Sequence, residues 1–327
     1  MVRCFSLVVL LAVAGFVAGQ EAKLEKGKWT VISDGTLSKV EKVGYPGKTA
    51  GVAVDPANGN VFMVMPDNGM WLSTDHGETF SRVDDKKIGG RCETGYALNF
   101  DPAGKRLMCF MIYGSSARTD DGGKTWTASK TSHLDFGGVD WHATGKVFLA
   151  LRHEAGGLLT LSTDAGLTWT DLQKGFSHVG VVSDKILLAC KEKEKGILRS
   201  TDGGQNWTKV FETSPTARVM IVRDKTCYWA ASQGLLTSTN EGQTWDPLAG
   251  SPPCAFGPYF GLRAEDLMVV NKEGFHESTD GGKSWKLVAP LPEGFHVGLV
   301  GPNYAWDPRA SILYASSMGK DTLRFVR

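Results

Sequence analysis

The sequence predicts an all-β protein, a seven-bladed β-propeller built from four-stranded blades. The first observation is an eight-residue pattern, Ser/Thr-x-Asp-x-Gly-x-Thr-Trp, which occurs six times with minor variation. Successive copies lie 46, 43, 38, 38 and 40 residues apart, and a period of about 40 residues with strand-like flanks is typical of one propeller blade per repeat. The third positions of the copies are Asp75, Asp121, Asp164, Asp202, Asn240 and Asp280.

The second observation is a seventh repeat that is divided between the two ends of the chain. Residues 323–327 resemble residues 197–199, which lead directly into the fourth copy, but the sequence stops before another copy begins. Residues 27–30 resemble the second half of a copy. We therefore expect the C-terminal region to supply three inner strands of the last blade and residues 28–32 to supply its outer strand, which would remove a free sheet edge.

The residues between the copies support strands. Short apolar runs at 51–54, 61–64, 107–112 and 147–151 are bounded by turn-forming residues, and the chain contains 40 glycines. No long segment shows sustained helical periodicity. The sequence therefore predicts a single propeller domain over residues 20–327.

Each copy of the pattern is predicted to hold a hairpin turn. The Ser and Asp side chains can accept hydrogen bonds from nearby backbone amides, the Gly allows a positive φ, and the Trp can cover the turn. A calcium-binding loop is the alternative, but each copy offers only one or two carboxylates, which is fewer than such a loop needs. We therefore predict a structural role and no metal site in these turns.

The N-terminal segment has the features of a cleavable signal peptide over residues 1–19. Arg3 is followed by an apolar run at 5–18, and small residues precede Gln20. The run is too short to span a membrane, and no later segment approaches the required length. We therefore expect a secreted or periplasmic protein without a membrane span.

Charge and cysteine content narrow the possible partners. The chain has 36 basic and 35 acidic residues without a basic block, which argues against nucleic acid or an anionic membrane as partner. Five cysteines follow residue 19, so at least one is unpaired in the expected monomer. Three of them lie in apolar runs, and a Cys92–Cys254 disulfide remains an alternative. The sequence contains no recognisable zinc motif, and it predicts no cofactor.

Candidate site residues precede or open the predicted innermost strands, which we expect to begin near Thr94, Phe136, Val179, Val219, Phe260 and Val297. The candidates are Glu93, His133, Asp135, His178, Arg218, Tyr259 and His296. They are expected to converge on the channel face away from the repeated turns. There they could bind an acidic or hydroxylated ligand, with the histidines titrating between about pH 5 and 8, or perform acid/base chemistry. A metal held by His178, His296 and a carboxylate is a further alternative, as is a polar rim that only binds water.

The six copies resemble the Asp-box, or bacterial neuraminidase repeat, of sialidases, xyloglucanases, sortilin-type receptors and photosystem assembly factors. The resemblance implies a propeller hairpin, but it does not choose among enzymes, receptors and assembly factors. The Phe/Tyr-Arg-Ile-Pro motif of sialidases is absent, the length allows one propeller where xyloglucanases resemble a pair, and the neutral charge differs from the arginine-rich face of the assembly factors. Sortilin-type receptors would need a membrane span.

We therefore expect a secreted propeller that binds a saccharide or acidic glycan at one channel face. The preference for a saccharide rests on the resemblance alone. Two alternatives stay open, namely a glycan-active enzyme (a sialidase-like glycoside hydrolase or a polysaccharide lyase) and a scaffold for a protein partner. The sequence does not decide whether the protein is an enzyme.

Overall fold

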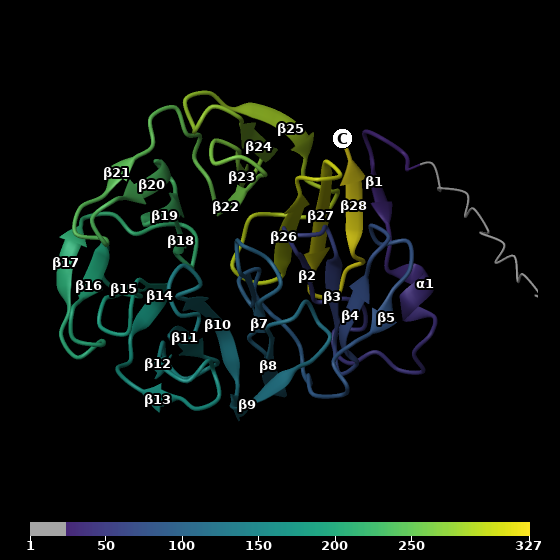
Figure 1. Cartoon of the computed structure of the whole chain (residues 1–327), viewed down its shortest axis with the longest axis horizontal. Helices are drawn as coiled ribbons and strands as arrows, with labels where there is room; N and C mark the ends of the chain where they lie inside the picture. The colour runs from purple at the N-terminus through teal and green to yellow at the C-terminus, as the bar shows by residue number, and fades with distance from the viewer. Residues whose placement is uncertain (1–23) are drawn as a thin grey trace, which may run out of the picture.

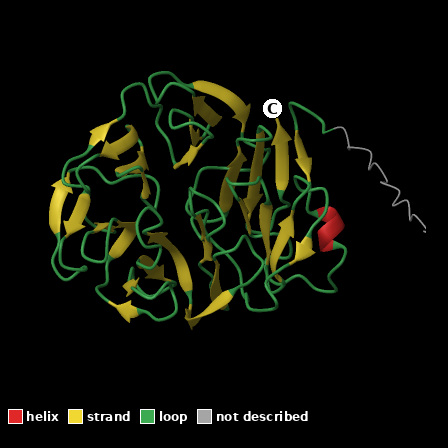
Figure 2. Ribbon diagram, in the orientation of Figure 1, coloured by secondary structure: helices red, strands yellow, loops and turns green. Residues whose placement is uncertain are grey.

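The computed structural model describes residues 24–327, which form seven four-stranded antiparallel sheets arranged in a ring (Figure 1). The predicted all-β, seven-bladed propeller is confirmed. A single helical turn, α1 (Asp34–Leu37), lies outside the ring (Figure 2). The predicted signal peptide at 1–19 lies outside the described residues. No helix within residues 24–327 is long and apolar enough to cross a membrane.

Each blade runs from an innermost to an outermost strand in chain order, except the last. Blade 1 contains β2 (Gly51–Val54), β3 (Val61–Met65), β4 (Gly69–Ser73) and β5 (Ser81–Arg82). Blade 2 contains β6 (Leu98–Phe100), β7 (Leu107–Cys109), β8 (Ser115–Thr119) and β9 (Thr127–Ser132). Blade 3 contains β10 (Leu134–Val139), β11 (Phe148–Arg152), β12 (Leu159–Ser162) and β13 (Thr170–Asp171).

The remaining blades follow the same order around the ring. Blades 4 to 7 contain β14 (Phe176–Val181), β15 (Leu187–Lys191), β16 (Ile197–Ser200), β17 (Thr208–Phe211); β18 (Ile221–Arg223), β19 (Thr226–Ala231), β20 (Gly234–Ser238), β21 (Asp246–Pro247); β22 (Phe256–Phe260), β23 (Leu267–Asn271), β24 (Gly274–Ser278), β25 (Lys286–Pro290); and β26 (Pro302–Asp307), β27 (Ile312–Ser317), β28 (Leu323–Val326), β1 (Trp29–Val31).

Blade 7 closes the ring with strands from both ends of the described chain, as predicted. Strand β1 pairs antiparallel with β28, and Trp29 lies opposite Phe325. The Trp29 ring packs against Phe325 and against Phe275 of blade 6, and its Nε1 donates a hydrogen bond to the Pro290 carbonyl at 3.0 Å. The outer strand of blade 7 is therefore attached both to its own sheet and to the neighbouring blade.

The Asp-box turns share one hydrogen-bond pattern across all six copies. In the first copy, the Ser73 hydroxyl accepts from the Gly77 amide at 2.7 Å, and the Asp75 carboxylate accepts from the Thr79 amide at 2.9 Å and from its hydroxyl at 2.6 Å. Gly77 has a φ of 91°, and a Cβ there would come within 2.6 Å of Ile32. Both carboxylate oxygens are therefore engaged within the turn.

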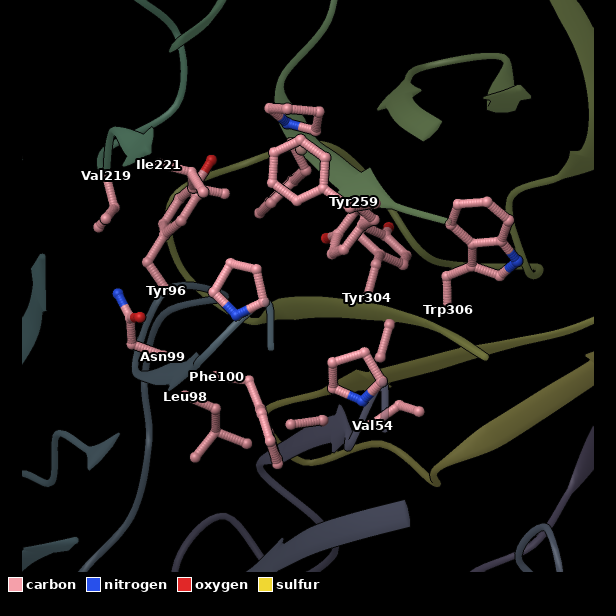
Figure 3. Close-up of a pocket in the computed structure, with 18 of the residues that line it drawn as sticks. Val54, Tyr96, Leu98, Asn99, Phe100, Val219, Ile221, Tyr259, Tyr304 and Trp306 are labelled. Atoms are coloured by element: carbon pink, nitrogen blue, oxygen red, sulfur yellow. The ribbon is translucent and has the colours of Figure 1, made fainter. Parts of the chain in front are cut away.

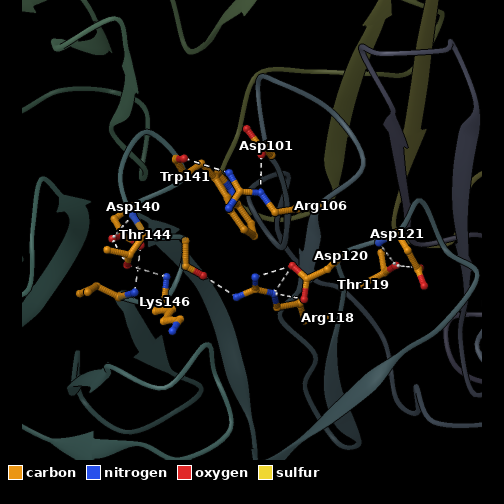
Figure 4. Close-up of polar contacts among 12 residues, drawn as sticks. Asp101, Arg106, Arg118, Thr119, Asp120, Asp121, Asp140, Trp141, Thr144 and Lys146 are labelled. Carbon is orange, nitrogen blue, oxygen red and sulfur yellow. Dashed lines mark hydrogen bonds and ion pairs between the residues drawn. The ribbon is translucent and has the colours of Figure 1, made fainter.

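A second set of aspartates, which was not predicted from the sequence, holds the turns between first and second strands. Asp140 is buried and accepts hydrogen bonds from the Val147 amide at 2.9 Å and the Thr144 hydroxyl at 2.7 Å (Figure 4). Asp101 pairs with Arg106 Nε at 2.6 Å. The other buried members are Asp55 and Asp307.

The antiparallel order assigns loops to two faces of the ring. Loops between third and fourth strands hold the Asp-boxes, and loops between first and second strands lie on the same face, which we call the box face. The innermost strands begin at the other face, which we call the upper face. Loops between second and third strands also lie on the upper face.

The described cysteines are buried and free, so the alternative of a Cys92–Cys254 disulfide is wrong. The Cys92 thiol lies 3.9 Å from the Phe110 carbonyl, and the Cys254 thiol lies 3.9 Å from that of Ala231. Burial raises the pKa of both thiols to about 12. These cysteines therefore act as small apolar core residues.

Removing β1 should destabilise the whole ring. A chain that begins at residue 34 should have a free energy of unfolding at least ~3 kcal/mol below that of a chain that begins at residue 24, because it loses a strand ladder and the apolar burial of Trp29. Chemical denaturation of the two chains measures this difference. Equal stability would show that the ring does not depend on this closure.

The carboxylate of an Asp-box should stabilise its turn through hydrogen bonds. Asp75→Ala should lower the free energy of unfolding by about 1–2 kcal/mol, because the Thr79 amide loses its acceptor. Asp75→Asn should cost much less, since Asn240 in the fifth copy makes the equivalent bond to the Thr244 amide at 3.0 Å. Denaturation of both variants tests the role of the turn, and an equal loss for both would contradict it.

Candidate functional site

The segment 93–96 crosses the top of the central channel from blade 2 to blades 6 and 7. The Glu93 carbonyl accepts from the Gly301 amide at 2.9 Å, and the Tyr96 hydroxyl donates to the Ala255 carbonyl at 2.6 Å. A Cβ at Gly95 would lie 2.1 Å from the Pro302 carbonyl oxygen, so this close approach requires glycine. Gly95 and Tyr96 of this segment also line a cavity within the channel.

The cavity within the channel has a volume of about 170 Å³ and a largely apolar lining that includes several aromatic rings (Figure 3). Tyr96, Tyr259 and Tyr304 contribute to it, and burial raises the pKa of each of these phenols. Tyr259 was expected beside the other candidates at the channel mouth. It instead lies inside β22 and lines this inner cavity.

A larger pocket of about 690 Å³ opens among blades 3, 4 and 5 at the upper face. Asp135 of β10, His178 of β14 and Arg218, which precedes β18, all line it. The loop at 191–195 adds alternating Lys and Glu side chains to the wall. Three of the seven predicted residues therefore line one pocket.

Arg218 is a half-buried cation in this pocket. Its Nη1 donates to the Ser177 carbonyl at 3.2 Å and lies 3.5 Å from His178 Nδ1. No carboxylate among residues 24–327 lies within ion-pairing distance of its guanidinium. Burial lowers the pKa of Arg218, because desolvation penalises the charged form. The guanidinium can therefore accept a ligand anion without first losing a protein partner.

His178 stays neutral beside this arginine. Burial, together with the charge of Arg218, lowers the pKa of His178 to about 3. Its Nδ1 lies 2.8 Å from the Ser177 hydroxyl. The expectation that this histidine titrates between pH 5 and 8 is therefore wrong, and its imidazole is a neutral hydrogen-bonding group at physiological pH.

Three rings gather beside the pocket, at the upper edge of blades 2 and 3. The Tyr113 ring lies 5.0 Å from that of His133 and 5.3 Å from that of His153, and the two imidazoles are 6.4 Å apart. Asp135 Oδ1 lies 2.7 Å from His153 Nδ1, and His153 Nε2 lies 3.3 Å from the Tyr113 hydroxyl. Burial raises the pKa of Asp135, and His153 partly offsets this effect.

Arg91 extends this cluster across the upper face. Its guanidinium lies 4.7 Å from the centroid of the Tyr113 ring and 4.9 Å from that of Tyr45. Glu93, one of the predicted site residues, accepts from Arg91 Nε at 3.1 Å and is thus engaged in an ion pair. Tyr45 and Tyr113 are 68% and 49% exposed, so both rings are available to a ligand.

Several innermost strands begin at residues other than those predicted. For this reason the seven predicted site residues do not all lie together. β6, β18 and β26 begin at Leu98, Ile221 and Pro302, each later than predicted, whereas β22 begins earlier, at Phe256. His296 therefore lies exposed in the loop before β26, where its carbonyl accepts from the Tyr304 hydroxyl at 2.9 Å. Within residues 24–327, no group of His, Cys, Asp and Glu is arranged to hold a metal ion, which leaves the His178–His296 alternative without structural support.

Tyr113 and His153 were not among the predicted site residues, because both lie outside the segments that precede the innermost strands. Tyr113 lies between β7 and β8, and His153 directly follows β11. Both therefore belong to loops between second and third strands, which reach the same face. The sequence signal that could have located them is a Tyr between the second and third strands of blade 2 and a His at the equivalent place in blade 3.

The neutral state of His178 gives the stability a defined pH dependence. The pKa of His178 in the folded state lies below the unfolded value of 6.5. The contribution of neutral His178 to the free energy of unfolding is therefore complete above pH 6.5 and is lost as the pH falls. Between about pH 6 and pH 4, the free energy of unfolding should decrease by up to ~1.4 kcal/mol per pH unit through this group.

Denaturation of the parent and of His178→Gln at each pH isolates that contribution, with the exposed His142→Gln as control. The His178→Gln curve should be flatter in this interval, and the His142→Gln curve should follow the parent. Parallel curves for the parent and His178→Gln would show that His178 is charged in the folded state.

Comparisons with known proteins agree with this architecture. A family model described as the BNR/Asp-box repeat matches residues 198–209. A xyloglucanase of Hypocrea jecorina (strain QM6a) is 33% identical over 135 residues, which cover 39% of this chain and only 14% of the relative.

Two solved structures are similar in fold. The structure titled YCF48 bound to D1 peptide has a TM-score of 0.53 at 14% identity and covers 93% of this chain and 97% of its own. The Niastella koreensis GH74 enzyme has a TM-score of 0.54 at 16% identity and covers 86% and 52%. The chain is thus a seven-bladed β-propeller, and its residues 198–209 match the BNR/Asp-box repeat.

Proposed function

We propose that the protein binds an acidic saccharide in the upper-face pocket, with a ligand carboxylate on Arg218. The observation that supports this most directly is the half-buried guanidinium without a carboxylate partner among the described residues. A guanidinium binds a carboxylate through two parallel hydrogen bonds, and partial desolvation strengthens that contact.

Other arginines around the pocket are already paired. Arg152 lines the same pocket, but its Nε donates to Asp171 at 2.6 Å, and Arg91 pairs with Glu93. A ligand anion would have to compete with a protein carboxylate at either position. Arg218 is therefore the preferred anion partner.

The surroundings suit a hydroxylated ligand. The 191–195 loop offers Lys donors and Glu acceptors to ring hydroxyls, and neutral His178 adds a further polar group. The exposed rings of Tyr45 and Tyr113 offer flat surfaces on which the apolar face of a sugar can pack. The similarity to a xyloglucanase, and the predicted signal peptide, also favour an extracellular glycan over an intracellular metabolite.

A scaffold that binds a peptide carboxylate is the second candidate. One protein of the same fold is described as bound to the D1 peptide. A peptide C-terminus or an acidic side chain would use the same guanidinium. The saccharide is preferred because of the exposed tyrosines and the polar pocket wall.

Binding of oligogalacturonate tests the proposal by calorimetry. Arg218→Gln should weaken binding at least about tenfold, because it removes a charged hydrogen-bonding partner. Arg152→Gln is the matched control from the same pocket and should change the affinity much less. Methyl esterification of the oligosaccharide should weaken its binding to the parent protein by a similar factor.

Three outcomes would contradict the proposal. They are equal effects of the two arginine substitutions, unchanged affinity for the ester, and tight binding of an acidic peptide when no acidic saccharide binds. The last outcome would favour the scaffold.

A further inference from the structure

We propose that Tyr113, His153 and Asp135 form an acid/base relay that cleaves an acidic polysaccharide by β-elimination. The inference rests on the proposed function, because it takes the bound acidic saccharide as its substrate. None of the three residues is needed to form the blade sheets through its side chain, and two of them lie in upper-face loops. Their arrangement joins a carboxylate, an imidazole and a phenol in series.

The hydrogen bonds define the direction of proton transfer. An ionised Asp135 can only accept, so His153 Nδ1 donates to Asp135 Oδ1 across 2.7 Å. The other nitrogen, Nε2, is then an acceptor, and the Tyr113 hydroxyl donates to it across 3.3 Å. Asp135 thus fixes the tautomer in which His153 can take the phenolic proton.

One further carboxylate faces the relay. Glu154 is exposed, and its Oε2 lies 3.5 Å from the Tyr113 hydroxyl, while its Oε1 lies 3.7 Å from His153 Nε2. It can stabilise a protonated His153 from the solvent side. Its exposure leaves it free to move when a ligand approaches Tyr113.

Three residues at or beside the relay have an unusual backbone conformation. Tyr113, His133 and Glu154 have φ values of 54°, 61° and 52°, in the left-handed region that residues other than glycine rarely adopt. Such residues gather at functional sites, where the surrounding structure maintains the strain. Here paired backbone hydrogen bonds of 3.0 and 3.1 Å between Ile112 and Arg91 hold the Tyr113 loop in place.

Two further nitrogen-bearing side chains lie beside Tyr113. The Arg91 guanidinium lies 4.7 Å from the centroid of the Tyr113 ring, so a positive charge lies next to the reacting group. Arg91 uses Nε and Nη2 for Glu93. The exposed His133 ring lies 5.0 Å from that of Tyr113, so it can donate a hydrogen bond to a substrate carboxylate at this position.

The proposed step balances without an added reactant. The Tyr113 oxygen removes the proton from the carbon α to a uronate carboxylate, while the phenolic proton passes to His153 Nε2. The electron pair of the broken C–H bond forms a double bond to the β carbon, and the β carbon–oxygen glycosidic bond breaks. The leaving oxygen takes the proton from protonated His153. The products are an unsaturated uronate and a new hydroxyl end, and both protein groups return to their starting states.

Elimination fits the site better than hydrolysis. Glycoside hydrolysis usually employs two carboxyl groups, one as acid and one as base or nucleophile. In this cluster Asp135 is hydrogen-bonded to His153 and Glu93 is paired with Arg91, which leaves Glu154 alone of the three carboxylates for a role that needs two. A phenol backed by an imidazole instead suits removal of a proton from carbon.

Arg218 and Tyr113 hold separate positions on the upper face, and this placement indicates the substrate class. Asp135 and Arg218 line one pocket, while Tyr113 lies beyond His153 at its edge. We therefore assign Arg218 and Tyr113 to different sugar residues of one chain. A polymer with repeated uronate units would present a carboxylate to Arg218 and a second uronate to Tyr113.

The test uses the full protein with polygalacturonate, alginate and hyaluronan as probes. Appearance of the conjugated double bond is followed by ultraviolet absorbance, and binding of each probe is measured separately. At least one probe should bind and be cleaved. Tyr113→Phe and His153→Gln should each lower kcat at least about a hundredfold. Circular dichroism and thermal melting verify that each variant is folded.

Asp135 is a positioning residue, because it acts through His153. Asp135→Asn should lower kcat at least about tenfold with little change in KM, since the binding groups are retained. His142→Gln, an exposed histidine that follows β10 on the box face, is the control and should leave turnover unchanged.

The outcomes separate this inference from the proposed function. A probe that binds through Arg218 without forming an unsaturated product would overturn the relay and leave the binding proposal intact. Failure of all three probes to bind would overturn both. New reducing ends without a double bond would indicate hydrolysis and refute the elimination. Full activity of Tyr113→Phe, with activity lost in His133→Gln, would identify another base and refute the relay.

Discussion

The antiparallel pairing of β1 with β28 is the interaction on which the ring depends. Strands β26, β27 and β28 alone would leave the outer edge of β28 unpaired. Strand β1, from the other end of the described chain, pairs with that edge. Trp29 reinforces the pairing, because it packs on Phe325 within the blade and on Phe275 of the neighbouring blade. Closure in turn fixes the seven innermost strands around one axis.

The closed ring determines which polar side chains lie in the inner cavity and which lie on the upper face. The inner cavity and the upper-face pocket are lined by different residues. The inner cavity buries tyrosines that take part in the packing of the ring. The upper face instead collects a desolvated arginine, a neutral histidine and a carboxylate–imidazole–phenol series. The physical contrast between packed phenols and an exposed, hydrogen-bonded phenol explains why Tyr113 rather than Tyr259 is assigned a reactive role.

The sequence allowed the blade number and the closure to be predicted, because each Asp-box carries a turn in its own residues. Ser73, Asp75 and Gly77 form their hydrogen bonds within a few positions of one another, so a local pattern suffices. The candidate site depends on contacts across blades. Arg218 and His178 are 40 positions apart and approach only in the folded ring. The register shift between Phe256 and Tyr259 of β22 likewise depends on the pairing with β23, which no local pattern indicated.

A crystal structure of Tyr113→Phe with a uronate oligosaccharide would show directly whether an acidic saccharide binds across the upper face. We expect one carboxylate in bidentate contact with Arg218, at about 2.7–2.9 Å, and a second uronate beside residue 113. A saccharide bound in the inner cavity beside Tyr259, or on the box face, with Arg218 unoccupied, would contradict it.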